Sequence, residues 1–350
     1  MGKFILNLNG PLLKLPNNIV DGSFDYVGRY QLIAEIIHRY FDGKNPKNIL
    51  DVGGLGTFLD KIIDTPLTIL DEEAHDADQE KKGDGARMNF EDGAFEAVVT
   101  SDTLEHIPQK DRKKFVSELV RVSSDLVILC APFDNKGVAK EEMQLQNFYT
   151  SVSGHPHRWL KEHAEYKLPN VAYIKQCFED LGISYLVVGH STLALWRQIM
   201  GMNLLANEMG NRDVSMAATK VNKYYNQNIL FEDFEQEGYR TFIIASKKRN
   251  ISYQPNTNKM TIEHSLELLG LISDFYMTAI TEPEYVPILR KKVKDLHDST
   301  MEFAQQIERL NKKLELVKSE NKSLLHSRSW RYTAPLRKVD AKIVRKKGTK

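Results

Sequence analysis

Cysteines are scarce in this sequence, long apolar runs are absent, and the net charge is close to zero. Only Cys130 and Cys177 occur among 350 residues. Both lie in apolar segments, so we predict reduced core cysteines, with no disulfide and no metal site. No window approaches the roughly 18 apolar residues that a membrane span needs. The formal net charge of +1 favours no particular kind of partner.

The first residues are unlike an export signal. Their short apolar stretch is interrupted by Asn7, Asn9 and Pro11, which is too broken for the apolar part of a signal peptide. We therefore expect a cytoplasmic protein, either soluble or attached peripherally to the inner face of the cell membrane.

Apolar, β-branched runs alternate with helical patterns from residue 26 to residue 249. This alternation predicts a Rossmann-like, doubly wound α/β domain with a mostly parallel sheet. Residues 1–25 are predicted to form a separate N-terminal segment. Helices are expected over 57–63 and 109–122, and strands over 48–52, 67–70, 97–101, 126–130, 184–188 and 240–245.

Two long insertions interrupt the alternation, at residues 134–167 and 191–238. Both are too long for ordinary connections, and they follow the fourth and fifth predicted strands. Ligands of open α/β sheets bind outside the carboxyl ends of the strands. We therefore expect helical insertions that cover the site and bind the acceptor.

The last hundred residues differ in composition. Residues 250–260 resemble a linker, and residues 261–326 are predicted to be helical. Apolar residues repeat with alternating spacings of three and four over 286–324, which predicts a coiled coil and a homo-oligomer, although the repeat does not decide between a dimer and a trimer. The alternative is one amphipathic helix folded back on the domain.

The tail, residues 327–350, is basic and carries Trp330 and Tyr332. Such a segment suits an anionic membrane surface, or it recruits glycan-assembly enzymes. A solubilising tail is the alternative, and nucleic acid is not an expected partner.

The most informative segment is NILDVGGLGTFL, residues 48–59. A predicted strand carries Asp51 near its end and leads through Gly53, Gly54 and Gly56 into a predicted helix. Glycines let a ligand approach the backbone at the positive end of that helix, which indicates a nucleotide-like ligand. The dinucleotide fingerprint does not fit, because Leu59 occupies the place of its third small residue. This spacing argues against a nicotinamide enzyme.

Further polar residues follow the next predicted strands. Asp71 lies twenty residues beyond Asp51, where a carboxylate can accept both hydroxyls of a ribose. Asp84 lies on a loop and is a candidate for the amino group of adenine. Ser101 and Asp102 end the third strand beside the same ligand.

ILDVGGLG, LTILD and the segment from GDG to SDTLEHIP together resemble the ordered motifs of class I S-adenosylmethionine-dependent methyltransferases, type 11. The resemblance covers about residues 26–133 and implies S-adenosylmethionine as the cofactor. It also implies that Gly53, Gly54 and Gly56 line the methionine side, that Asp71 holds the ribose, and that Asp84 with Gly85 contacts adenine.

The whole chain is similar to a narrower group, bacterial surface-polysaccharide and O-antigen methyltransferases with a C-terminal coiled coil. Residues 155–169 and 327–337 carry this similarity. It implies O-methylation of a sugar or sugar phosphate on a glycan or lipid-linked glycan. The alternatives are a non-catalytic scaffold that binds the cofactor and recruits glycan-assembly enzymes, and a methyltransferase of quinone-type small molecules.

A sugar hydroxyl must lose its proton as it is methylated, and histidine is the usual base. His157 and His106 are the catalytic candidates, whereas a phosphate acceptor would need no base. We predict that the acceptor is bound by His155, Arg158, Trp159 and His163, since an indole stacks on a sugar face and arginine pairs with phosphate.

Overall fold

The computed structural model describes residues 2–75 and 77–281, together with scattered helical positions between 291 and 319. The chain divides into two units, Met1–Tyr285 and Val286–Lys350. Most of the predicted coiled coil over 286–324, and all of the basic tail over 327–350, lie outside the described residues.

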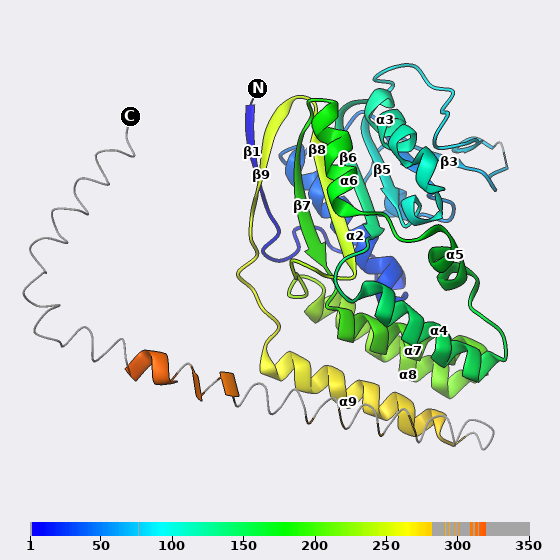
Figure 1. Cartoon of the computed structure of the whole chain (residues 1–350), viewed down its shortest axis with the longest axis vertical. Helices are drawn as coiled ribbons and strands as arrows, with labels where there is room; N and C mark the ends of the chain where they lie inside the picture. The colour runs from blue at the N-terminus through cyan, green and yellow to red at the C-terminus, as the bar shows by residue number, and fades with distance from the viewer. Residues whose placement is uncertain are drawn as a thin grey trace, which may run out of the picture. The chain divides into compact units, whose positions relative to one another are not determined.

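A seven-stranded sheet forms the centre of the first unit (Figure 1), in the order β4-β3-β2-β5-β6-β8-β7. Its pairs are parallel except those of β8, which runs antiparallel to both of its neighbours. The predicted α/β class and the six predicted strands are confirmed, and β4 is an additional edge strand. The strands are β2 (Ile49–Val52), β3 (Leu67–Asp71), β4 (Glu80–Lys82), β5 (Phe95–Ser101), β6 (Ser123–Pro132), β7 (Ser184–His190) and β8 (Arg240–Ser246).

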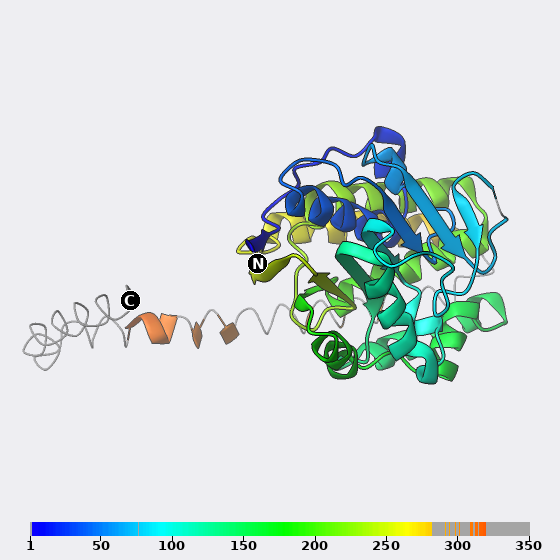
Figure 2. The ribbon, with the colours of Figure 1, turned by 90° about the horizontal axis from the view of Figure 1, so that it is seen from above.

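Helices cover both faces of this sheet (Figure 2). On one face lies α2 (Phe24–Tyr40), and on the other lie α3 (Arg112–Val122) and α6 (Val171–Asp180). The two predicted core cysteines are confirmed as free and buried. The predicted helix over 109–122 is present as the short 3-10 helix η3 (Gln109–Asp111) followed by α3.

The prediction of an α-helix over 57–63 is wrong. The segment forms only a three-residue 3-10 turn, η1 (Leu59–Lys61). Gly56 before it has a φ of +82°, and Pro66 after it disfavours helical geometry for the preceding residue. The stretch between these two residues forms a single 3-10 turn and no α-helix. The argument from the positive end of a helix therefore does not apply to this loop.

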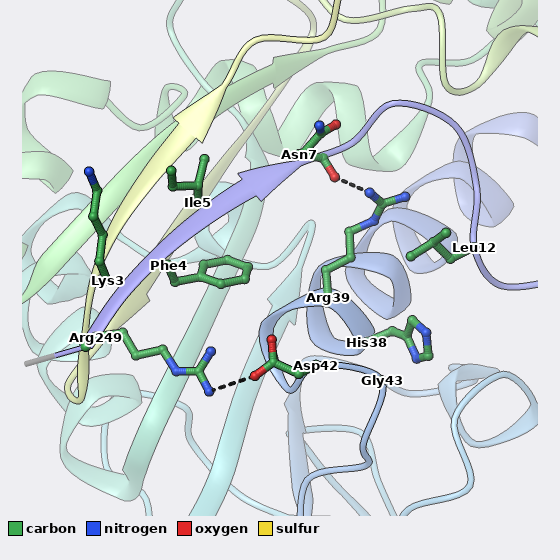
Figure 3. A pocket seen from close by; sticks show the side chains of 11 residues that line it. Lys3, Phe4, Ile5, Asn7, Leu12, His38, Arg39, Asp42, Gly43 and Arg249 are labelled. Atoms are coloured by element: carbon green, nitrogen blue, oxygen red, sulfur yellow. Dashed lines mark hydrogen bonds and ion pairs between the residues drawn. The ribbon is translucent and has the colours of Figure 1, made fainter.

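The N-terminal segment and the predicted linker each contain a strand. β1 (Gly2–Asn7) pairs in parallel with β9 (Arg249–Gln254) to form a two-stranded sheet. A groove of about 700 Å³ lies beside β1 (Figure 3). Arg39 of α2 donates to the carbonyl oxygen of Asn7, and Arg249 pairs with Asp42 at 3.3 Å. Residues 1–25, which also include α1 (Asn17–Val20), are thus part of the main unit.

The two insertions are helical, as predicted. The first forms α4 (Val138–Ser153) and α5 (Arg158–Tyr166); the second forms α7 (Leu193–Met209), α8 (Arg212–Tyr224) and the π-helix η4 (Tyr225–Ile229). Helix α4 packs against α7, and both follow the carboxyl ends of strands (Figure 1). The insertions therefore meet each other at the edge where a ligand of this fold would bind.

Helix α9 (Ile262–Ala279) begins where the helical region was predicted, but it belongs to the first unit. It packs against α8, and Leu268, Ile272 and Phe275 are buried. Their burial ties the helix to the rest of the first unit. Within the described residues, no helix combines the length and the apolar character needed to cross a bilayer.

Candidate active site

Strand register brings the predicted cofactor residues to one edge of the sheet. Val52 of β2 pairs with Leu70 of β3 and with Thr100 of β5. The residues that follow these three, Gly53, Asp71 and Ser101, therefore lie at the same level. The amide of Gly53 donates to the carbonyl oxygen of Leu70 at 2.8 Å, which fixes the start of the glycine loop.

Buried acceptors without good partners lie at this edge. The two carboxylate oxygens of Asp51 make no well-formed hydrogen bond within the described chain. The hydroxyl of Ser101 makes none either. Burial raises the pKa of Asp51 to about 7, although weak hydrogen bonding from Thr57 and Tyr30 acts in the other direction. A ligand with hydrogen-bond donors, such as the ammonium group of S-adenosylmethionine, fits these acceptors.

Two glycines of the loop are also required by the packing of the protein itself. A Cβ on Gly53 would overlap the Thr103 side chain, and one on Gly54 would overlap the carboxyl group of Asp51. The protein itself thus fills the space beside both glycines. Only Gly56 leaves the backbone open, since the nearest atom to its Cβ position is 3.9 Å away.

Asp71, the candidate for the ribose, is the last residue of β3, and Asp84, the candidate for adenine, lies on the loop after β4. Asp71 Oδ1 accepts from the amide of Glu73 at 2.8 Å, and Asp84 Oδ1 accepts from the amide of Ala86 at 2.7 Å. These bonds hold both carboxylates in place. Gly85 packs closely on Phe115, which explains the glycine. The ligand contacts of all three positions stay predictions.

Asp102 is held by protein partners that the sequence did not reveal. Its carboxylate binds Arg29 and Arg240, and Arg240 also pairs with Asp25. Burial alone would raise the pKa of Asp102. The charges of Arg240 and Arg29 outweigh this effect, so the pKa lies well below its usual value. Asp102 also has a positive φ of +51°. It is therefore a charged anchor beside the cofactor edge.

A second polar cluster lies just beyond it. The 3-10 helix η2 (Leu104–His106) supplies Glu105 and His106, and α5 supplies His163. The two imidazole rings are 5.0 Å apart, and Glu105 Oε1 lies 3.9 Å from His163 Nε2. Burial and the charge of Asp102 raise the pKa of Glu105 to about 8.

Two more glutamates hold the histidines of this cluster. His163 Nδ1 contacts Glu142 at 2.9 Å, and His106 Nδ1 contacts Glu162 at 2.9 Å. Burial lowers the pKa of His163, but Glu142 more than offsets this, so the net direction is upward. For His106, burial and the charge of His163 outweigh the opposite effect of Glu162, so the pKa of His106 is lowered. Sequence reasoning missed Glu142 and Glu162, because each is separated from its partner by many residues.

The remaining predicted acceptor residues lie at the start of α5. His157 stacks edge-on against Trp159, with ring centroids 5.3 Å apart, and its Nδ1 is buried without a hydrogen-bond partner in the described chain. Burial lowers the pKa of His157. Trp159 is 59% exposed, and Arg158 is also exposed. Tyr149 lies edge-on to both His155 and His157, with ring centroids 5.6 Å and 5.1 Å apart.

Known proteins match this chain in sequence and in fold. Residues 63–129 match the family model described as a methyltransferase domain. This segment begins just after η1 and ends within β6, so it contains Asp71, Asp84, Glu105 and His106. The match confirms the predicted enzyme class, a methyltransferase that depends on S-adenosylmethionine, and with it the predicted cofactor.

Solved structures similar to this chain include S-adenosylmethionine-dependent methyltransferases from Thermotoga maritima (12% identity, 66% of this chain and 92% of that chain, TM-score 0.41) and Archaeoglobus fulgidus (16%, 62% and 94%, 0.37). Another is magnesium protoporphyrin IX methyltransferase from Synechocystis PCC 6803 with bound S-adenosylhomocysteine (13%, 69% and 91%, 0.36). At these identities and TM-scores, the three structures carry no information on the acceptor of this chain.

Proposed function

We propose that this methyltransferase transfers a methyl group to a hydroxyl of a sugar or sugar phosphate in a bacterial surface polysaccharide. The observation that carries the proposal is the pair of His157 and exposed Trp159 at the start of α5, which packs against η2 beyond the cofactor edge. An exposed indole provides an apolar face for a sugar ring. The neighbouring imidazole provides a base for its hydroxyl.

S-adenosylmethionine supplies the methyl group. Asp71 would hold its ribose, Asp84 its adenine, and Asp51 with Ser101 its amino group, because these acceptors lie at the edge where the glycine loop begins. Fixed positions for cofactor and acceptor favour an in-line displacement by lowering the entropic part of the barrier.

His157 suits the role of the base on two grounds. Its Nδ1 has no partner in the described chain, and its lowered pKa keeps the imidazole neutral near pH 7. As the acceptor oxygen forms its bond to the methyl carbon, the carbon–sulfur bond breaks and sulfur keeps the electron pair. The hydroxyl proton passes to His157 and then to solvent.

Two features of the C-terminal region belong to the same proposal. The apolar repeat over 286–324 would form a homo-oligomeric coiled coil, and the basic tail over 327–350 would bind an anionic membrane surface or glycan-assembly enzymes. A peripheral position at the inner face of the membrane would bring the enzyme to lipid-linked glycans. The similarity of residues 155–169 and 327–337 to surface-polysaccharide methyltransferases supports this choice of acceptor.

The test is transfer of label from tritiated S-adenosylmethionine to lipid-linked glycans extracted from bacteria that lack this protein. We expect O-methylated sugars after acid hydrolysis of the product. His157→Ala should lower turnover by about 100-fold or more, whereas His264→Ala, a matched substitution at a histidine of α9 that pairs with Glu232, should have little effect. Calorimetry with S-adenosylmethionine should give the same affinity for both variants.

Other outcomes distinguish the alternatives. Cofactor binding without transfer to any acceptor would favour the scaffold, and transfer to quinone precursors but not to glycans would favour the small-molecule enzyme. Full turnover in His157→Ala would remove His157 as the base.

A further inference from the structure

Three side chains on two neighbouring segments converge outside the residues that the proposed transfer uses. Glu105, His106 and His163 each offer a ligand atom, and these atoms lie within 4.8 Å of one another. Glu105 and His163 are almost completely buried, with side chains 1% and 7% exposed. A carboxyl group buried this deeply is neutralised by a proton, by a charged partner or by a metal ion.

Glu105 lacks full compensation from the protein. Its Oε2 is buried without a hydrogen-bond partner in the described chain. Its Oε1 lies 3.9 Å from His163 Nε2, beyond hydrogen-bond distance. The side chain therefore presents an unpartnered oxygen beside an imidazole nitrogen.

Each histidine has a carboxylate beside its Nδ1, and for His163 the contact is a hydrogen bond. His163 Nδ1 contacts Glu142 Oε1 at 2.9 Å, and Glu142 in turn accepts from the hydroxyl of Tyr239 at 2.9 Å. His106 Nδ1 contacts Glu162 Oε2 at 2.9 Å. In metal centres the ring nitrogen that is not bonded to the ion donates to a carboxylate in this way. Nε2 of His163 is then left for a ligand, and His106 offers a buried Nδ1 that has no hydrogen-bond partner in the described chain.

The backbone that carries these groups is itself fixed. Arg112 donates from Nε to the carbonyl oxygen of Ile107 at 2.9 Å and from Nη2 to that of Lys167 at 2.5 Å. Ile107 follows η2 and Lys167 follows α5, so one buried arginine joins the two segments that hold the cluster. Such support outside the ligands is what a metal site requires to keep its geometry.

We propose that Glu105, His106 and His163 bind one divalent transition-metal ion, of the zinc class. Two imidazole nitrogens and one carboxylate oxygen suit Zn²⁺ with a fourth position open, whereas Mg²⁺ and Ca²⁺ prefer oxygen ligands alone. Tetrahedral Zn²⁺ sets its ligand atoms about 3.4 Å apart. The contact between His163 Nε2 and Glu105 Oε1 thus needs to shorten by roughly half an ångström.

The site deepens the proposed function, and this link rests on that function being right. An ion with an open position, close to the cofactor edge, would bind the acceptor hydroxyl and lower its pKa. His157 would then remove the proton from a hydroxyl whose pKa the ion has already lowered. The site would select acceptors whose hydroxyl can reach the ion.

The first test measures metal binding alone, without cofactor or acceptor. The full chain is dialysed against a chelator and titrated with Zn²⁺ by calorimetry, with Mg²⁺ in parallel. We expect one Zn²⁺ per chain and no comparable Mg²⁺ binding. Substitution of Co²⁺ should give visible absorption bands of a four-coordinate site.

Variants locate the ion. His163→Gln and His106→Gln should abolish tight Zn²⁺ binding, and Glu142→Gln, which removes only an orienting partner, should weaken it by roughly 10- to 100-fold. His264→Gln is the matched control. His264 lies on α9, outside the cluster, and its Nδ1 pairs with Glu232 at 2.8 Å. Circular dichroism confirms folding, and the partly exposed His106 provides a variant that does not disturb the core.

A flat Zn²⁺ isotherm for the wild-type chain, or wild-type affinity in both His163→Gln and His106→Gln, would overturn the site. An equal loss of Zn²⁺ affinity in His264→Gln would also overturn the site, since it would indicate binding by histidines outside the cluster. These results are independent of methyl transfer, which is tested separately. If the chelated enzyme methylates glycans at the full rate, the catalytic role of the ion is wrong even though the proposed transferase stands.

Discussion

Asp51 is a buried acid whose charge the folded chain does not neutralise, and this has a measurable consequence. Its pKa rises from the usual 3.8 to about 7, mainly through burial. Between these two pH values the folded chain retains a proton that the unfolded chain has released. By linkage, stability falls as the pH rises through this window, and the full loss is present above pH 7.

The magnitude follows from the size of the pKa change. Each tenfold change in proton affinity corresponds to about 1.4 kcal/mol, so the ionised Asp51 costs on the order of 4 kcal/mol of unfolding free energy at pH 8. Asn has nearly the same shape and cannot ionise. We therefore expect Asp51→Asn to be more stable than wild type at pH 8, by up to about 4 kcal/mol, and to differ little from it at pH 4.

Equilibrium unfolding in urea, followed by tryptophan fluorescence in the absence of cofactor, measures this difference at several pH values. Ser101→Ala, an uncharged substitution at the same edge, is the control and should change stability by an amount that does not depend on pH. The reasoning would be refuted if Asp51→Asn were less stable at pH 8, or if its difference from wild type were the same at pH 4 and pH 8.

Three further predictions concern neighbouring residues. Gly54→Ala should destabilise the fold by about 1–3 kcal/mol through overlap with Asp51, and thermal unfolding should show a smaller loss in an Asp51→Gly background; equal losses would contradict the overlap. Arg240→Met removes the arginine partner of Asp25 and one of the two arginines that bind Asp102, so urea unfolding should show a loss of about 3–5 kcal/mol; a near-neutral change would refute this. Asp71→Ala should weaken S-adenosylmethionine binding by at least tenfold in calorimetry, since it removes about 1.5–3 kcal/mol per charged hydrogen bond; unchanged affinity would remove Asp71 from the ribose site.

The central strands of this fold are predictable from the sequence because strands buried on both faces have continuous apolar runs. Residues 126–130, in β6, are an example, with every side chain buried. β4 was missed because Glu80–Lys82 is short and charged, as an edge strand can be. The pairing of β1 with β9 was missed because it joins residues 247 positions apart along the chain. No local pattern reports such a contact.

The candidate site shows the same division between local and distant information. Asp51, Asp71 and Ser101 were predictable, because each ends a strand and parallel strands end at one edge. Arg29, Arg240 and Glu142 were not, because their roles depend on partners from other elements. Arg240 comes from the antiparallel strand β8, and the alternation of strands and helices does not reveal that direction.

The glycine loop shows how a correct residue can be predicted for an incomplete reason. The sequence suggests that Gly53 and Gly54 make room for a ligand, but in the structure Thr103 and Asp51 occupy that room. Only Gly56 faces open space. A side chain at Gly54 would therefore damage the fold before it affected the ligand, so loss of activity in Gly54→Ala would not by itself locate the cofactor. Cofactor affinity in Asp71→Ala and stability in Asp51→Asn separate the two roles of this edge, since one residue faces the loop surface and the other the core.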